Sequence, residues 1–240
     1  MESLNKFNVS STYIPLDGGE TVVLNLKTST SQSLQTSQKF VLIAIDVSGS
    51  MSGSPIEAAK KVICDMITYM HEELKNDNIG FIQFNTKCFY YSLKGKPTQR
   101  CIEGVTKVVA GGGTQFVPVF DEIEKLLTTT PIDDFCVVFL SDGQAEKINV
   151  LKPKIESLKA TMAKYTSNSE FHTIGFSSDH DAVLLSEMTR ACTGQGTFQY
   201  VKSSSEIKEC MEAITGFLGE KRIGAEIYAP VNNSTKRVHF

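Results

Sequence analysis

The chain has 240 residues, of which 41% are hydrophobic and 21% are charged, as in an ordinary globular protein with a substantial core. Its formal net charge is −3, from 24 basic and 27 acidic residues, and it contains no run of five basic residues. This charge balance argues against nucleic acid and anionic membranes as partners. The apolar runs are too short to cross a bilayer, and the N-terminus lacks the pattern of a secretory signal.

The cysteines indicate reduced thiols rather than a disulfide framework or a zinc site. No two of them form a C-x-x-C pair, and one lies inside the apolar run "FCVVFL", where a buried thiol is expected. We therefore expect a cytoplasmic protein. The six are Cys64, Cys88, Cys101, Cys136, Cys192 and Cys210.

Residues 1–38 are predicted to form an N-terminal β extension followed by a polar linker. The run "ETVVLNLKT" alternates apolar and polar residues, as a half-buried strand does, and "STSQSLQTSQ" is almost wholly polar. This segment differs from residues 39–218, where apolar runs and helical periods alternate.

Residues 39–92 are predicted to form a strand, a helix and a hairpin. "KFVLIAID" reads as a fully buried strand, and Ser54-Pro55 offers a helix N-cap followed by proline. "NIGFIQFN" and "KCFYYSL" are so close in sequence that they must pair antiparallel. The aromatic residues Tyr90 and Tyr91 on that edge strand are either partner contacts or ordinary strand residues.

Further along the chain, a short helix is predicted over residues 102–109, and Thr114 is expected to cap a second helix. "DFCVVFLSDG" contains the fourth strand, and Pro153 is expected to begin the next helix. "FHTIGF" is the fifth strand, residues 181–191 a helix, and "GTFQYV" the sixth strand.

The last predicted helix spans residues 203–218, where Ser203 and Glu206 form a capping-box pattern. Residues 219–240 are expected to form a C-terminal β extension, or the start of a further domain, because "RIGAEIYAP" alternates again. The half-apolar strands at the two ends of the chain could pair with each other beside the main domain.

The alternation of buried strands and helices predicts an α/β fold. We expect a doubly wound, mostly parallel six-stranded sheet with one antiparallel edge strand and helices on both faces, spanning residues 39–218. Ligands of such sheets bind at the carboxyl ends of the strands, near the point where the strand order reverses. This rule selects the loop after Ile45 and the loop after Leu140.

Three loops at this edge carry oxygen ligands. The first is "DVSGS" with Asp46, Ser48 and Ser50, the second is "GGGTQF" with Thr114, and the third is "SDG" with Asp142. Two carboxylates and three hydroxyls without His or Cys form an all-oxygen set, which suits a hard divalent cation that keeps some of its waters. Taken alone, a D-x-S-x-S pattern is more often a turn with a helix cap.

The chain resembles a von Willebrand factor A domain with a metal-ion-dependent adhesion site. The resemblance rests on "DVSGS" at 46–50, Thr114 in "GGT" and Asp142 in "FLSDG", and it covers about residues 39–218. The version "DVSGSM" is more similar to intracellular members than to integrin-type ones.

The resemblance implies roles for these residues. Ser48 and Ser50 would bind the metal directly, as would Thr114 when a ligand is bound, and Asp46 and Asp142 would act mainly through bound waters. The sixth position would accept an Asp or Glu carboxylate from a partner protein. The last helix, residues 203–218, is by the same resemblance either an allosteric lever or a static cover for the sheet.

An enzyme with a similar topology is the main chemical alternative. Phosphatases of the haloacid dehalogenase type place an aspartate after the first strand and bind Mg²⁺, but they need D-x-D, and position 48 is serine. A serine hydrolase is disfavoured because "GSMSG" has methionine at its centre, and His172 on a buried strand is expected to be a core residue.

The sequence therefore predicts a non-enzymatic, Mg²⁺-dependent protein–protein interaction module, with Mn²⁺ or Ca²⁺ as other possible metals. The alternatives are a scaffold with a purely structural metal, packed against the rest of a larger protein, and the Mg²⁺-dependent phosphatase. The predicted metal residues are Asp46, Ser48, Ser50, Thr114 and Asp142.

Overall fold

A computed structural model describes residues 38–142, 145, 147–176 and 180–201, together with the backbone of four further strands at 7–16, 19–28, 226–231 and 234–239. The predicted helix at 203–218 lies outside the described residues. The chain divides into a first unit, residues 1–37, and a second unit, residues 38–240. Within the described part, no helix is long and apolar enough to cross a membrane.

The second unit contains a six-stranded sheet with the order β5-β4-β3-β6-β7-β8. Neighbouring strands are parallel except for β5, which pairs antiparallel with β4 at one edge. This arrangement confirms the predicted sheet. The strands are β3 (Phe40–Asp46), β4 (Ile79–Phe84), β5 (Cys88–Ser92), β6 (Asp134–Ser141), β7 (Asn168–Phe176) and β8 (Phe198–Val201).

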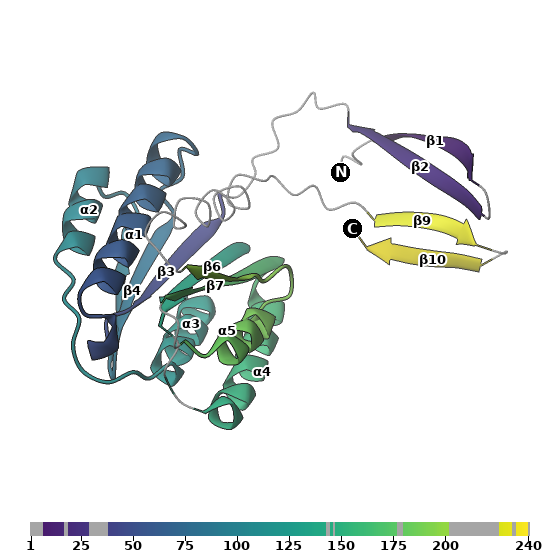
Figure 1. Ribbon diagram of the computed structural model, residues 1–240. Coiled ribbons are helices and arrows are strands. Elements are labelled where there is room, and N and C mark those ends of the chain that lie inside the picture. The colour runs from purple at the N-terminus through teal and green to yellow at the C-terminus, as the bar shows by residue number, and fades with distance from the viewer. Residues whose placement is uncertain are drawn as a thin grey trace. The chain divides into compact units, whose positions relative to one another are not determined.

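Helices cover both faces of this sheet, as expected for buried parallel strands. Helices α1 and α2 lie on one face and α3, α4 and α5 on the other (Figure 1). The helices are α1 (Ser54–Glu72), α2 (Thr98–Thr106), α3 (Val117–Thr129), α4 (Ile148–Tyr165) and α5 (Ala182–Met188), with short 3-10 turns at Gly49–Met51 and Thr189–Ala191.

The core consists of two apolar layers, one on each face of the sheet. Because side chains alternate along a strand, Val41, Ile43 and Ile45 of β3 pack against α1, whereas Leu42 and Ala44 face the other layer. All five are fully buried. The apolar run that precedes Asp46 is therefore continuous because helices cover both faces of the sheet. The strand ends where this run ends, at Asp46.

Helix α1 begins one residue earlier than the sequence indicates. Its N-cap is Gly53, with φ of +84°, so Ser54 is the first helical residue and Pro55 the second. The prediction of Ser54 as N-cap was wrong by one position. The chain turns sharply after the 3-10 turn, and glycine is the residue that adopts this left-handed φ without steric strain.

Two other predicted helix starts are wrong. Helix α3 begins at Val117 after the fully buried Phe116, so Thr114 lies ahead of the helix and does not cap it. The Phe116 ring packs edge-on against Phe139, with centroids 5.0 Å apart, and this packing fixes the chain just before the helix. Pro153 lies inside α4, whose first turn includes the fully buried Leu151, because core contacts outweigh the hydrogen bond that proline removes.

Each end of the chain forms its own antiparallel hairpin. β1 (Phe7–Leu16) pairs with β2 (Gly19–Thr28), and β9 (Glu226–Val231) pairs with β10 (Ser234–His239). The predicted strands at the two ends are thus present, and each pairs with its neighbour in sequence. A two-residue connection makes local pairing inexpensive in chain entropy, and "DG" at residues 17–18 is a hairpin signal that the sequence reading missed.

Candidate metal centre

The candidate site lies where the strand order of the sheet reverses. β3 is flanked by β4 on one side and by β6 on the other, so the loops after β3 and β6 leave the sheet next to each other. Asp46 is the last residue of β3, and Asp142 directly follows β6. The two carboxylates are 96 residues apart in sequence, and the strand order brings them to the same edge of the sheet.

Asp46 is fully buried, and both of its carboxylate oxygens accept hydrogen bonds. The backbone N–H of Ser48 donates to Oδ1 over 2.8 Å, and the hydroxyl of Ser141 donates to Oδ2 over 2.6 Å. The carboxylate therefore ties its own loop to the end of β6. Its orientation is fixed before any ligand arrives.

The two serines of the first loop lie close together. The Oγ atoms of Ser48 and Ser50 are 3.0 Å apart and share a hydrogen bond. Ser48 is buried and precedes the 3-10 turn, whereas Ser50 lies within the turn and is exposed. The turn thus presents two hydroxyl oxygens side by side, one from inside the fold and one from its surface.

The glycine segment 111–113 packs against this first loop through backbone hydrogen bonds. Gly49 N–H donates to Gly112 O over 2.9 Å, and Gly111 N–H donates to Val47 O over 2.7 Å. Gly112 has φ of +86°, and a Cβ on Gly49 would lie 3.2 Å from Gly112 O. This close approach requires small residues, and it places the half-buried Thr114 two residues beyond a contact with the D-x-S-x-S loop.

Asp142 is 4% exposed, and its Oδ1 is buried without a hydrogen-bond partner among the described residues. The six ion pairs of the described residues include neither Asp142 nor Asp46. Two buried carboxylates without a cation are unfavourable, because desolvation and mutual repulsion both act against the charged forms. A bound cation would reduce this unfavourable free energy.

The pKa of Asp46 reflects the same competition. Burial raises the pKa of the Asp46 carboxyl above its ordinary value of 3.8, and the charge of Asp142 raises it further. The hydrogen bonds from Ser141 and Ser48 act in the opposite direction and do not cancel the effect of burial. A divalent cation at this position would restore the charged carboxylate.

The structure adds two residues that the sequence reading did not select. Ser141 binds Asp46 directly, and the Asn85 side chain donates to Gly111 O over 2.9 Å while its backbone carbonyl accepts from Gln115 N–H. Both residues end or follow strands, at Ser141 in "FLSD" and Asn85 in "QFN". That position, at the carboxyl edge of the sheet, was the available signal.

A second group of metal-ligand types lies elsewhere, at the other end of the strands. Ligand atoms of Cys136, Glu170 and His172 lie within 4.8 Å of one another, and all three side chains are fully buried. Glu170 is already paired with Lys39 over 3.1 Å, and burial raises the pKa of the Cys136 thiol, which disfavours the thiolate that a metal requires. We assign this group to the core as a buried ion pair.

His172 confirms the expectation of a core residue. Its Nδ1 shares a hydrogen bond with Thr197 Oγ1 over 2.7 Å, and the ring is fully buried on β7. The cysteines of the described part are also all free.

The fold and the loop geometry define a class of protein: an α/β domain with a ligand site at the switch point of its sheet. The family model of the von Willebrand factor type A domain matches residues 41–213, and the chain belongs to this family. It is 29% identical over 185 residues to a von Willebrand factor A domain-containing protein of Dictyostelium discoideum, covering 75% of this chain and 19% of that protein. It is also 23% identical over 199 residues to the voltage-dependent calcium channel subunit alpha-2/delta-2 of Mus musculus, covering 78% of this chain and 16% of that one.

Solved structures show the same fold. The von Willebrand factor type A protein from Catenulispora acidiphila matches with a TM-score of 0.67 and 16% identity, over 96% of this chain and 55% of that one. Proximal thread matrix protein 1 from the mussel byssus, with a zinc-occupied MIDAS motif, matches with a TM-score of 0.57 and 13% identity, over 80% of this chain and 49% of that one. The chain spans about a fifth of the length of the two curated relatives.

Proposed function

We propose that this domain binds a divalent cation, Mg²⁺ in the first place, and uses it to bind an Asp or Glu carboxylate of a partner protein. The observation that carries the proposal is the pair of buried carboxylates, Asp46 and Asp142, which have no cationic partner among the described residues. Domains of this family commonly mediate protein–protein interactions, and some do so through a metal.

The residues at the site fit a hard cation. Ser48 and Ser50 would supply neighbouring hydroxyl oxygens, Thr114 a third, and Asp46 and Asp142 the negative charge. Mg²⁺ prefers oxygen ligands in octahedral geometry at about 2.1 Å and retains several waters. Two carboxylates at most neutralise the charge of the Mg²⁺ ion. A further carboxylate from a partner would then complete a coordination shell that the domain leaves incomplete.

The relatives support the metal without identifying it. The mussel protein has the same fold and binds zinc at its MIDAS motif, so a divalent metal is reasonable here. The all-oxygen donor set suits Mg²⁺, Mn²⁺ and Ca²⁺, and Mg²⁺ is proposed first because so few charged ligands suit an ion that retains several waters. We also propose that this metal-ion-dependent adhesion site (MIDAS) is intact, that it is of the intracellular "DVSGSM" type, and that the protein is cytoplasmic.

Two other functions stay open to test. In the first, the metal is purely structural and the domain is a scaffold within a larger protein. In the second, Asp46 is the nucleophile of a Mg²⁺-dependent phosphatase. Both carboxylate oxygens of Asp46 already accept hydrogen bonds. Position 48 is serine, whereas a phosphatase of this type needs a second aspartate there as general acid, so the site favours binding over catalysis.

Calorimetric titration of Mg²⁺ into chelator-treated protein tests the metal. We expect saturable heat in the native protein, no heat in Asp46→Ala, and unchanged heat in Asp65→Ala, which removes an exposed aspartate from α1 as a charge-matched control. Absence of metal-dependent heat in the native protein would refute the proposed site.

Two further measurements separate the alternatives. Proteins captured from lysate with Mg²⁺ but released by chelator would support recruitment, whereas equal capture in both conditions would favour a structural metal. Hydrolysis of p-nitrophenyl phosphate that Asp46→Asn abolishes would establish the phosphatase instead.

A further inference from the structure

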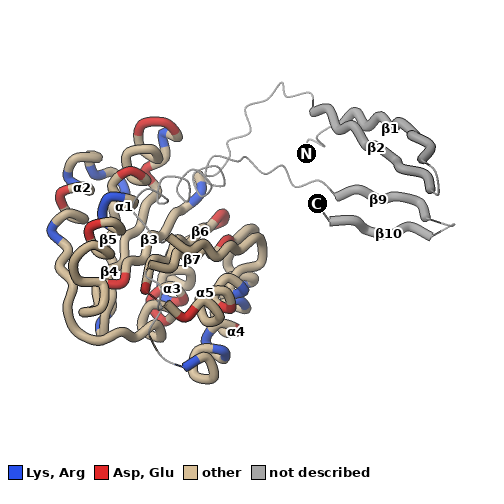
Figure 2. Tube along the Cα trace, in the orientation of Figure 1, with Lys and Arg blue, Asp and Glu red and all other residues tan. Residues whose placement is uncertain are grey.

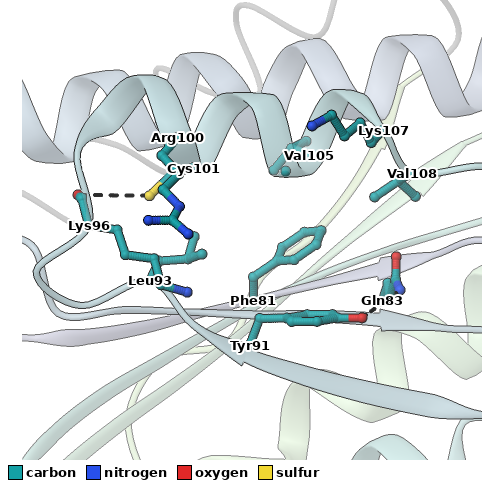
Figure 3. Close-up of a pocket in the computed structure, with 11 residues that line it drawn as sticks. Phe81, Gln83, Tyr91, Leu93, Lys96, Arg100, Cys101, Val105, Lys107 and Val108 are labelled. Atoms are coloured by element: carbon teal, nitrogen blue, oxygen red, sulfur yellow. Dashed lines mark hydrogen bonds between the residues drawn. The ribbon is translucent and has the colours of Figure 1, made fainter.

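A groove lies beside the candidate metal centre, between helix α2 and the β4–β5 edge of the sheet. It consists of two adjoining hollows of about 330 and 240 Å³, which share Gln83, Lys107 and Val108. Figure 3 shows the larger hollow, with α2 on one side and the aromatic rings of Phe81 and Tyr91 on the other. We call the combined surface the α2 groove.

The α2 groove has an apolar floor because α2 covers the sheet edge only in part. Phe81 of β4 pairs in register with Tyr91 of β5, and Gln83 with Phe89, so all four side chains project from the face that carries α1 and α2. Phe89 is 48% exposed and Tyr91 43% exposed. These aromatic surfaces remain open although they lie on the covered side of the sheet.

The walls of the α2 groove are basic. Its lining includes Lys87, Lys96, Arg100 and Lys107 and no acidic residue. All four cations are exposed, and none has an acidic side chain of a described residue within 4.0 Å. Figure 2 shows basic segments in blue on α2, on a chain whose net charge is −3. A groove with an apolar floor and unneutralised basic walls is complementary to acidic residues that flank an apolar one.

The α2 groove lies next to the candidate metal centre, although none of the five candidate metal residues lines it. The smaller hollow is lined by Val47, which lies between Asp46 and Ser48, and by Asn85, which binds the glycine segment at Gly111 O. Val109, 81% exposed, lies at the same end. A chain that reaches the metal with one carboxylate would therefore pass the loop at Val47 to enter the α2 groove.

We propose that the α2 groove is a second contact surface for the protein partner: it binds an extended acidic segment that carries an aromatic or aliphatic residue. The apolar side chain packs against the exposed rings of Tyr91 and Phe89, and the flanking carboxylates pair with Arg100 and Lys107. This inference rests on the proposed function, in that the same partner supplies the carboxylate for the metal. Because the α2 groove consists of two adjoining hollows, it fits an extended peptide chain better than an enclosed small molecule.

The test uses a displayed library of random peptides selected on the whole protein in Mg²⁺. Enriched peptides are then synthesised with a fluorescent label, and their binding is measured by anisotropy. The groove variant is Arg100→Glu with Lys107→Glu, and the charge-matched control is Lys152→Glu with Lys159→Glu on α4, across the sheet. Tyr91→Ser removes part of the apolar floor without changing the charge.

We expect the enriched peptides to combine acidic residues with an aromatic or aliphatic one. The groove variant should weaken their binding roughly tenfold or more, Tyr91→Ser should weaken it also, and the control should leave it unchanged. Failure to enrich such peptides, or equal binding to the groove variant and the control, would overturn the proposal.

Calorimetry distinguishes this proposal from the metal site. If the groove variant retains the Mg²⁺ heat but binds the peptides as the native protein does, the groove proposal fails alone. If the native protein shows no Mg²⁺ heat while the groove variant still loses the peptides, the metal proposal fails and the groove stands as a separate peptide site.

Discussion

Replacing Asp46 with asparagine should stabilise the metal-free protein and abolish its response to metal. Asparagine keeps the size of the side chain and both hydrogen bonds: Oδ1 can still accept from Ser48 N–H, and Nδ2 can donate to Ser141 Oγ, which becomes the acceptor. What the substitution removes is a fully buried negative charge close to that of Asp142.

The sign of the effect follows from the competition at this carboxylate. Hydrogen bonds to a charged group contribute about 1.5–3 kcal/mol each, and hydrogen bonds between neutral groups about 0.5–1.5 kcal/mol, so the variant loses part of that stabilisation. Burial and repulsion outweigh those bonds, since together they raise the pKa of Asp46 in spite of them. We expect a net gain of about 1 kcal/mol, which corresponds to a melting temperature higher by about 2–4 °C for a domain of this size.

Thermal denaturation in chelator and in Mg²⁺ measures both parts of this prediction. In chelator, Asp46→Asn should melt above the native protein. At a free Mg²⁺ concentration of about 100 times the Kd, the native protein should gain about 2.7 kcal/mol, and the variant should gain nothing. A variant that melts below the native protein in chelator would show that the buried charge is not a cost, and an equal Mg²⁺ gain would place the metal elsewhere.

Three further predictions concern the same fold. Lys39→Met should destabilise the protein by about 3–5 kcal/mol in urea denaturation, because it removes the ammonium group that pairs with the fully buried Glu170. Combining it with Glu170→Gln should recover much of the lost stability. A double variant without recovery would contradict the ion-pair assignment. Gly112→Ala should lower the stability by about 1–2 kcal/mol in the same assay and weaken Mg²⁺ binding, because the φ of Gly112 is +86° and the new Cβ would lie 3.2 Å from Asn85 Nδ2. A variant with unchanged stability and unchanged Mg²⁺ affinity would show that the loop adapts. Mg²⁺ affinity should fall as pH is lowered towards the raised pKa of Asp46, since protons compete with the metal for that carboxylate; calorimetry across this pH range measures the change. In chelator, the contribution of Asp46 to stability should be fully present below pH 3.8 and lost as pH rises through the raised pKa of Asp46. Urea denaturation across the same range tests this second prediction.

Most of the fold follows from local patterns in the sequence. The run from Val41 to Ile45 is apolar on both faces because helices cover both, and this pattern, together with the alternation of strands and helices, predicted a mostly parallel sheet. The short link between β4 and β5 required an antiparallel pair, which the structure contains. Helix starts were less well predicted: Pro153 lies within α4 because the burial of Leu151 outweighs a local preference.

The sequence by itself selected the five candidate metal residues, because their order and their positions at strand ends follow the von Willebrand factor A pattern. Only the tertiary structure could show that Ser141 orients Asp46, or that Gly49 and Gly112 join two loops, since these contacts link segments more than 60 residues apart. The α2 groove also has no local signature. Its basic walls and aromatic floor come from different elements, which the register of β5 on β4 and the placement of α2 bring together.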